Sequence, residues 1–264
     1  SKGVAVLISG TSAIHLALIL LEVKAGDTVF CQSITFSASA NPIAYQGAIP
    51  VFIDSEIDTW NMDPVLLRSA LEEAKQKGKL PKAIIPVHLY GMPAKMVEIL
   101  TIAHEYGVPV IEDAAEALGS SIDNKPCGSF GEFGVLSFNG NKIITTSGGG
   151  ALLSENAEMI EKARFLATQA RDAAPHYQHS HIGYNYRMSN VLAGIGRGQL
   201  EVLNDRVAAR RNNFERYQQY FSILNNKGFE IQFQEEPVGY FSNRWLTCIL
   251  VDPAKNKGLT REVI

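Results

Sequence analysis

Residues 4–18 read Val4-Ala5-Val6-Leu7-Ile8-Ser9-Gly10-Thr11-Ser12-Ala13-Ile14-His15-Leu16-Ala17-Leu18. An apolar run gives way to small residues and then to a helical pattern, which predicts a strand, a turn and a helix. Small residues that open a helix leave backbone N–H groups free, and the helix dipole favours an anion beside them. We therefore expect Gly10, Thr11 and Ser12 to bind a phosphate group.

The same alternation of apolar runs and helical patterns continues along the chain. Asp63-Pro64 is typical of a helix start, and Gly107 of a helix end. Strands are expected at residues 4–8, 28–31, 49–53, 82–88 and 109–113, and helices at 12–22, 37–46, 63–77 and 95–106. This order predicts an α/β fold in which a mostly parallel central sheet carries helices on both faces.

The second half of the chain predicts a different organisation. A strand at 150–154 and a helix at 155–170 precede a polar, aromatic loop, and two long helical patterns follow near 188–203 and 205–227. Strand-like segments at 230–233 and 245–251 and a helix-like segment at 260–264 come last. We expect residues 1–204 to form a large domain, and 205–264 to form a linking helix and the start of a small α+β domain.

Lys142 is the most informative single residue. It follows the strand-like stretch 134–138 and lies between the hydroxyl of Ser137 and the glycine run 148–150. An ordinary lysine is a solvated surface charge, whereas a lysine in these surroundings suggests covalent chemistry with an aldehyde cofactor.

Asp113 ends the apolar strand 108–113, and an acid at the carboxyl end of such a strand faces the ligand crevice. It is the natural partner for a cationic ring nitrogen, although Asp113 to Glu116 also resembles a helix capping box. Phe36 stands before a helix start, where it could belong to the core or stack on a cofactor ring. Phosphate cradle, acid and lysine together predict a pyridoxal phosphate site.

Composition excludes several other classes. With 264 residues, 46% hydrophobic and 19% charged, the chain is typical of a soluble globular protein. With a net charge of -3, the chain has no excess of positive charge that would attract nucleic acid or an anionic membrane surface. No apolar run approaches the roughly 18 residues of a spanning helix, so we expect a cytoplasmic protein. Cys31, Cys127 and Cys248 form no CxxC pair and are expected to be free thiols.

Two further patterns have competing explanations. Residues 194–198 read Gly-Ile-Gly-Arg-Gly. This spacing departs from the dinucleotide-binding fingerprint, and the segment lies inside a helical pattern. Close helix packing at these glycines is therefore favoured, with a subunit interface as one possibility. His176, His179 and His181 match no zinc spacing, and we expect loop polarity or substrate contact rather than a metal.

At these residues the chain resembles the sugar aminotransferases of the DegT/DnrJ/EryC1/StrS family, whose fold is that of aspartate aminotransferase, the type I fold of pyridoxal phosphate enzymes. The resemblance covers nearly the whole sequence. It is carried by the segments 10–12, 112–115, 137–142 and 183–188, together with Phe36. Segments 35–42, 59–62, 137–142 and 170–172 look like those of enzymes that aminate UDP-linked 4-keto-6-deoxy-N-acetylglucosamine on the way to bacillosamine.

The resemblance implies a role for each matching residue. Lys142 would be the internal aldimine lysine and proton shuttle, and Asp113 would contact the pyridine nitrogen. Thr11, Ser12 and Ser137 would hold the phosphate, Phe36 would stack on the ring, and Glu116 would lie near the ring hydroxyl. Asn185 would reach the phosphate of the neighbouring subunit in a homodimer. Asn61, His179 and Tyr184 are candidates for substrate contact.

The implied reaction is a ping-pong transfer from glutamate to the C4 ketone of a nucleotide sugar. GDP- or dTDP-linked ketosugars are alternative substrates, and a non-catalytic nucleotide-sugar-binding paralogue is an alternative function. Related dehydrases carry histidine where Lys142 stands, so the lysine argues against dehydration. Family members are longer at both ends, and we expect parts of both domains to be missing from this chain.

Overall fold

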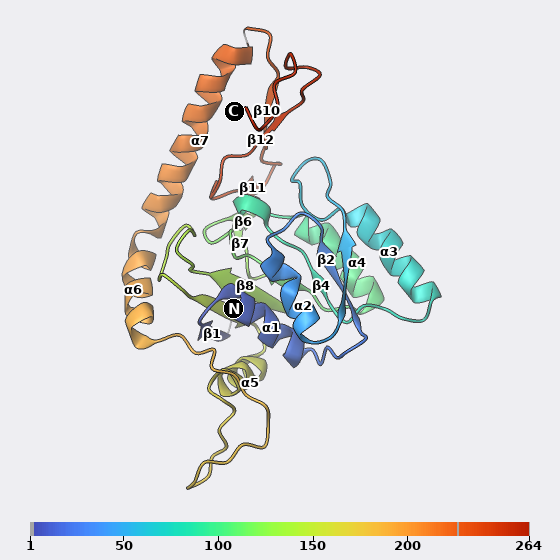
Figure 1. The fold of residues 1–264 in the computed structure, drawn as a ribbon, viewed down its shortest axis with the longest axis vertical. Helices are drawn as coiled ribbons and strands as arrows, with labels where there is room; N and C mark the ends of the chain where they lie inside the picture. Colours follow the sequence, from blue (N-terminus) through green and yellow to red (C-terminus); the bar gives the residue numbers. More distant parts are fainter. Residues whose placement is uncertain (1–2, 226, 264) are drawn as a thin grey trace.

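The computed structural model describes residues 3–225 and 227–263. Its strands and helices follow the expected alternation, as Figure 1 shows in sequence colours. In the first half they are β1 (Gly3–Leu7), α1 (Gly10–Leu20), β2 (Thr28–Gln32), α2 (Asn41–Tyr45), β3 (Ile49–Ile53), α3 (Pro64–Gln76), β4 (Ile84–Ile85), α4 (Met96–Tyr106) and β5 (Ile111–Asp113). The 3-10 turns η1 (Ser37–Ser39) and η2 (Leu89–Gly91) precede α2 and α4.

The second half begins with short strands and ends with long helices and a small sheet. Its elements are β6 (Ser121–Ile122), β7 (Lys125–Pro126), β8 (Phe133–Ser137), β9 (Gly150–Ser154), α5 (Ala157–Ala167), α6 (Asn190–Glu201), α7 (Leu203–Asn225), β10 (Ile231–Phe233), β11 (Tyr240–Phe241) and β12 (Ile249–Val251). In the described part of the chain, no helix combines the length and the apolar character needed to cross a membrane.

The central sheet consists of two hydrogen-bonded groups of strands, β3-β2-β4 and β5-β8-β9-β1. Parallel bridges from Ile84 to Val110 and from Val87 to Asp113 join the two groups between β4 and β5. Strand β9 pairs antiparallel with both of its neighbours, whereas the other pairs are parallel. The predicted mostly parallel sheet is therefore confirmed, with one reversed strand.

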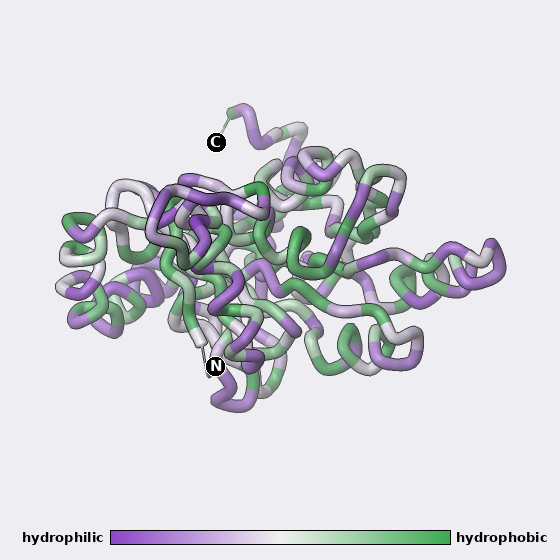
Figure 2. The backbone as a smooth tube through the Cα atoms, turned by 90° about the horizontal axis from the view of Figure 1, so that it is seen from below, coloured by the Kyte–Doolittle hydropathy of each residue, from purple (hydrophilic) through white to green (hydrophobic). Residues whose placement is uncertain are grey.

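Side chains alternate between the two faces of this sheet. On β2, Val29 and Cys31 pack into a core with α1, α2 and α5, whereas Phe30 between them packs with α3 and α4. Successive strand residues point to opposite faces, so the apolar run of β2 is explained by burial on both sides. Nearly all residues of α1 are buried, whereas α3 and α4 bury only one side. Figure 2 shows hydrophilic and hydrophobic stretches alternating along coils at the periphery of the molecule.

The helix ends are set by the predicted residues. Asp63 accepts a hydrogen bond from the Val65 N–H at 2.7 Å and caps α3, which begins at Pro64. Gly107 adopts a φ of 65° at the end of α4, a left-handed conformation that glycine adopts without steric cost.

Three of the predicted elements are shorter than expected or absent. The expected strand at 245–251 shortens to β12, and the expected strand at 82–88 to β4. No helix forms at 260–263, where the chain makes turns, and Ile264 lies outside the described residues. In Figure 1 the long helix α7 leads from α6 toward the β10–β12 pair. Because β11 pairs with β6, the C-terminal segment folds back onto the first half of the chain. The predicted boundary between a large and a small domain at residue 204 stays a prediction.

The glycines of α6 are less tightly packed than expected. A side-chain carbon at Gly196 would lie 3.0 Å from Thr146 Cγ2, but at Gly194 and Gly198 it would meet nothing within 4 Å. Of the three, only Gly196 is closely packed within this chain. A subunit interface at the other two stays a prediction.

Candidate active site

Most of the predicted cofactor residues meet at one cavity of about 290 Å³, between the carboxyl ends of β5 and β8 and the start of α1. Parallel strands place their carboxyl ends at the same edge of a sheet, so residues far apart in sequence converge there. Among the residues that line it are Gly10, Thr11, Phe36, Asp113, Glu116, Ser137 and Lys142.

The N-terminal turn of α1 forms one wall. Ser9 caps the helix by accepting a hydrogen bond from the Ser12 N–H at 3.0 Å, and the Ser12 hydroxyl donates back to the Ser9 carbonyl at 2.7 Å. Ser12 is buried and does not line the cavity, whereas Ser9, Gly10 and Thr11 do. The structure thus engages Ser12 in the cap and brings Ser9 to the wall in its place.

The glycine run after Lys142 lets β9 pass directly beneath this turn. A side-chain carbon at Gly150 would lie 2.3 Å from the carbonyl carbon of Ser9 and 2.5 Å from the Gly10 nitrogen. Both contacts are shorter than van der Waals distances, so only glycine fits without a shift of the backbone. The backbone of Gly150 therefore packs directly against the N-terminal turn of α1.

Asp113 lies at the floor of the cavity and is 5% exposed. Its carboxylate accepts hydrogen bonds from the Ser39 hydroxyl at 2.7 Å and from the Ala115 N–H at 3.1 Å. The Ala115 bond resembles the local capping contact anticipated from the sequence, and the Ser39 bond fixes the carboxylate from across the cavity. Burial and the nearby Asp113 charge raise the pKa of the Cys31 thiol to about 12, so Cys31 stays protonated at neutral pH.

Lys142 and Glu116 form an ion pair beside Asp113. Lys142 Nζ lies 3.3 Å from Glu116 Oε1, and both side chains are largely buried. The other carboxylate oxygen of Glu116 accepts a hydrogen bond from the Tyr90 N–H at 2.7 Å. Burial raises the pKa of Glu116, and the Lys142 charge and the Tyr90 N–H oppose that rise.

Phe36 and Ser137 complete the predicted lining. Ser137 ends β8 and is 8% exposed, which places its hydroxyl near the start of α1. Phe36 is 72% exposed and lines the cavity from η1. A planar ligand that entered the cavity would find this ring at its border.

The structure does not bring four other candidates to this cavity. Asn61 is fully buried; its amide nitrogen donates to the Met92 carbonyl at 3.0 Å and its oxygen accepts from the Leu89 N–H at 2.9 Å, so it holds loops together. His179 is exposed and lies 2.9 Å from the Gln169 carbonyl. Tyr184 stacks on Tyr186, and Asn185 between them is exposed.

Trp245 was not foreseen as a site residue. It lines the cavity, its ring lies under Lys142 Nζ at 4.3 Å from the centroid, and its indole N–H donates to the Asn141 carbonyl at 2.8 Å. No local pattern marks it, because it belongs to the segment that folds back with β11. One signal is compositional: the chain has only two tryptophans.

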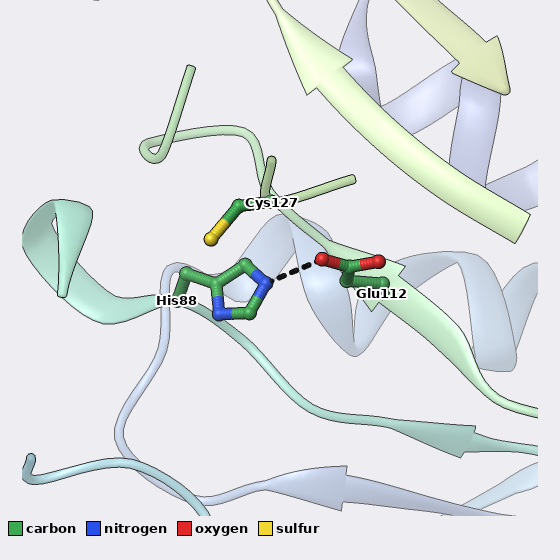
Figure 3. Close-up of side chains that lie close together, drawn as sticks. All are labelled: His88, Glu112 and Cys127. Atoms are coloured by element: carbon green, nitrogen blue, oxygen red, sulfur yellow. Dashed lines mark hydrogen bonds and ion pairs between the residues drawn. The ribbon is translucent and has the colours of Figure 1, made fainter. Parts of the chain in front are cut away.

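A buried cluster of His88, Glu112 and Cys127 has the residue types of a metal site (Figure 3). Its polar atoms are already engaged. His88 Nε2 lies 2.7 Å from Glu112, and His88 Nδ1 accepts the Ala94 N–H at 2.9 Å, which places the ring hydrogen on Nε2. Glu112 also accepts the N–H groups of Gly128, Phe130 and Gly131. This cluster therefore acts as a structural hydrogen-bond network.

The three cysteines are free, as predicted: Cys31 and Cys127 are buried and Cys248 is half-buried. Burial raises the pKa of the Cys248 thiol to about 12. Thiols with raised pKa values are poor nucleophiles, so neither Cys31 nor Cys248 suits catalysis.

A sequence model of the DegT/DnrJ/EryC1/StrS aminotransferase family matches residues 1–264. The chain belongs to this family. The family resemblance predicted from the sequence motifs is thereby confirmed, and so is the fold that it implied.

Three of the similar proteins illustrate the likeness. A putative pyridoxal phosphate-dependent aminotransferase, EpsN of Bacillus subtilis, is 61% identical over 95% of this chain and 64% of its own length. GDP-perosamine synthase of Caulobacter vibrioides is 40% identical over 83% and 57%. The crystal structure of a family aminotransferase from Brucella abortus superposes with a TM-score of 0.87 and 33% identity, over 94% and 65%. The chain thus spans less than two thirds of these relatives.

The residues present in this family member fit a pyridoxal phosphate group. A lysine amine, a buried carboxylate and a helix N-terminus surround one cavity, and these are the three contacts that an aldehyde, a ring nitrogen and a phosphate require.

Proposed function

We propose that this protein is a pyridoxal phosphate-dependent aminotransferase that acts on nucleotide-linked sugars. The observation that carries the proposal is the meeting of Lys142, Asp113 and the start of α1 at one cavity. The family match and the names of the relatives support it.

Each residue has a defined task in this proposal. When bound, pyridoxal phosphate supplies an aldehyde that bonds to amines and a ring that accepts electron density. The N–H groups of Gly10 and Thr11 and the Ser137 hydroxyl would hold its phosphate, and Asp113 would face its ring nitrogen. Phe36 would cover the ring, and Glu116 would lie near its hydroxyl. Lys142 would carry the cofactor and move a proton as general acid and base.

We further propose glutamate as donor and the C4 ketone of UDP-2-acetamido-2,6-dideoxy-4-ketohexose as acceptor, for polysaccharide or glycan synthesis in the cytoplasm. This substrate rests on the motif resemblance at residues 35–42, 59–62 and 170–172. A GDP-linked ketosugar is the second candidate, because the Caulobacter relative is named as GDP-perosamine synthase.

The active form is proposed to be a homodimer, in which Asn185 reaches the phosphate of the second subunit. Its exposure and its absence from the cavity of its own chain are compatible with this role. Light scattering on active protein tests the dimer, and an active monomer would contradict it.

The decisive experiment combines spectra with turnover. Added pyridoxal phosphate should produce a visible-range absorbance that disappears in Lys142→Ala; a variant that retains the same lysine-linked absorbance would contradict the role of Lys142. Amino transfer from glutamate is then compared on UDP-, GDP- and dTDP-linked 4-keto-6-deoxy sugars. Equal rates would refute the UDP assignment, and cofactor binding without transfer to any of them would favour a non-catalytic paralogue.

A further inference from the structure

Trp245 makes direct contact with the amine of Lys142. The distance of 4.3 Å from Nζ to the ring centroid lies well inside the range of about 6 Å over which an ammonium is attracted to an aromatic face. The Lys142 side chain is 12% exposed and Trp245 is 6% exposed. Little water separates the charge from the ring, so the attraction is weakly screened.

Two hydrogen bonds hold Trp245 in place. Its N–H donates to the Asn141 carbonyl, and its backbone N–H donates to Asn243 Oδ1, each at 2.8 Å. Asn243 is fully buried, and its amide nitrogen donates to the carbonyls of Glu116 and Leu118 at 2.9 Å. The ring is therefore tied to the backbone that carries Glu116 and to the residue next to Lys142.

Glu116 is held just as firmly on its own side of the amine. Its second oxygen accepts the Tyr90 N–H, and Tyr90 adopts a φ of 56°, a left-handed conformation that is uncommon outside glycine. The following residue, Gly91, has a φ of 93°, and a side-chain carbon there would lie 1.9 Å from Asn243 Oδ1. The turn at 90–91 thus supports both Glu116 and the anchor of Trp245.

We propose that Trp245 and Glu116 form a seat for the free ammonium of Lys142, and that Trp245 is a positioning residue for it. The inference rests on the proposed role of Lys142 as the covalent lysine. An aminotransferase releases this lysine from the cofactor in each half-reaction, and a free lysine has four rotatable side-chain bonds. A ring below and a carboxylate beside the amine hold it close to the cavity until it is needed again.

A purely structural role for Trp245 makes a different prediction. The ring also packs near Ile143, Ile144 and Val207, so any apolar replacement of similar bulk would serve a core function. Attraction to the ammonium depends instead on the π face, which is strong in tryptophan and is weakened when fluorine replaces the ring hydrogens. Fluorination leaves the bulk of the ring nearly unchanged, so a ring-fluorinated tryptophan at position 245 separates the two roles.

The test uses cofactor-free protein and reductive methylation with formaldehyde and a borane at neutral pH, which modifies uncharged amines. Mass spectrometry of the Lys142 peptide gives the rate, with exposed Lys162 as internal control. A ring-fluorinated tryptophan at position 245 should accelerate Lys142 methylation roughly three- to tenfold, and Trp245→Leu should accelerate it at least as much. A Lys142 rate in the fluorinated protein equal to that of the unaltered protein would overturn the proposal.

Glu116→Gln tests the seat without disturbing the apolar cluster, in case Trp245→Leu fails to fold. Removal of the carboxylate charge should accelerate methylation of Lys142 severalfold and leave Lys162 unchanged, and an unchanged Lys142 rate would overturn the proposal. Since no cofactor is present, the result is independent of the Lys142→Ala absorbance experiment. The seat and the proposed function can therefore fail separately.

Discussion

Glu112 and Asp113 are adjacent acids at the end of β5, and we predict that they have separate tasks. Glu112 is fully buried, and its two oxygens accept hydrogen bonds from His88 and from the N–H groups of Gly128, Phe130 and Gly131. Asp113 accepts two, from Ser39 and Ala115. Glu112→Gln should therefore destabilise the fold, whereas Asp113→Asn should spare the fold and impair the chemistry.

The magnitude follows from the number of acceptors lost. His88 Nδ1 already accepts the Ala94 N–H, so His88 Nε2 must donate, and the introduced amide nitrogen must turn toward Phe130 and Gly131. Two buried N–H groups then lack an acceptor, at about 1–3 kcal/mol each. We expect a loss of about 2–6 kcal/mol, a large part of the roughly 5–15 kcal/mol that stabilises a domain.

Asp113→Asn keeps an oxygen for the Ala115 N–H, and the Ser39 hydroxyl can accept from the new amide because a hydroxyl both donates and accepts. The stability loss should stay within about 1 kcal/mol. The charge opposite a ring nitrogen is lost, however. An ion pair at about 4 Å contributes on the order of 4 kcal/mol at an effective dielectric of 20, so transamination should fall on the order of a hundred- to a thousandfold.

Urea unfolding followed by circular dichroism measures the first effect, and single-turnover amino transfer measures the second. Glu105→Gln is the matched control, because Glu105 pairs with Arg68 on the surface and an exposed pair contributes about 0–1 kcal/mol. Separate tasks for Glu112 and Asp113 are refuted if Glu112→Gln loses no more stability than this control, or if Asp113→Asn loses as much as Glu112→Gln.

Gly150, His15 and Lys142 each give a further prediction. Gly150→Ala should lower the free energy of unfolding by about 1–3 kcal/mol, because the introduced methyl group meets the Ser9 backbone. The control Gly194→Ala should leave the free energy of unfolding equal or raise it by up to about 1 kcal/mol. Equal losses of the two variants in urea unfolding would contradict this prediction. Burial lowers the pKa of His15, so on acidification the unfolded chain binds a proton at this histidine before the folded chain does. The free energy of unfolding should therefore fall as pH drops below about 6.5. His15→Gln should flatten the dependence of that free energy on pH between pH 7 and 5, and an unchanged dependence would exclude His15 as its source. Lys142→Arg should keep the charge beside Glu116 yet fail to give the lysine-linked absorbance with pyridoxal phosphate, and a retained band would refute the covalent role.

The sequence predicted those parts of the fold and site that depend on local periodicity. Asp113, Ser137 and Gly10 each stand at the end of a strand or the start of a helix, and in an α/β sheet such positions share one edge. Their convergence on one cavity required only the order of elements. The reversal of β9 was not predicted, because an apolar strand buried on both faces reads the same in either direction.

The residues that were missed or misplaced depend on contacts that no local pattern contains. Asn61 lies beside Trp60 in a segment that resembles a substrate motif, but residues 28 to 31 positions away along the chain surround it and satisfy its amide. Ser12 has the residue type of a phosphate ligand, yet a hydrogen bond three residues back engages it in a helix cap. In both cases the side chain's chemistry was recognised, and its partner within the protein was not.

Trp245 shows why the missing information matters for catalysis. It is separated from Lys142 by about a hundred residues, and it reaches the amine only because β11 pairs with β6 and Asn243 bonds to the Glu116 and Leu118 carbonyls. The same Asn243 leaves room only for glycine at position 91, and the turn at 90–91 in turn directs the Tyr90 N–H to Glu116. A substitution at Gly91 should therefore disturb Trp245 and Glu116 together. The geometry around the lysine depends on this long-range packing as much as on the strand that precedes it.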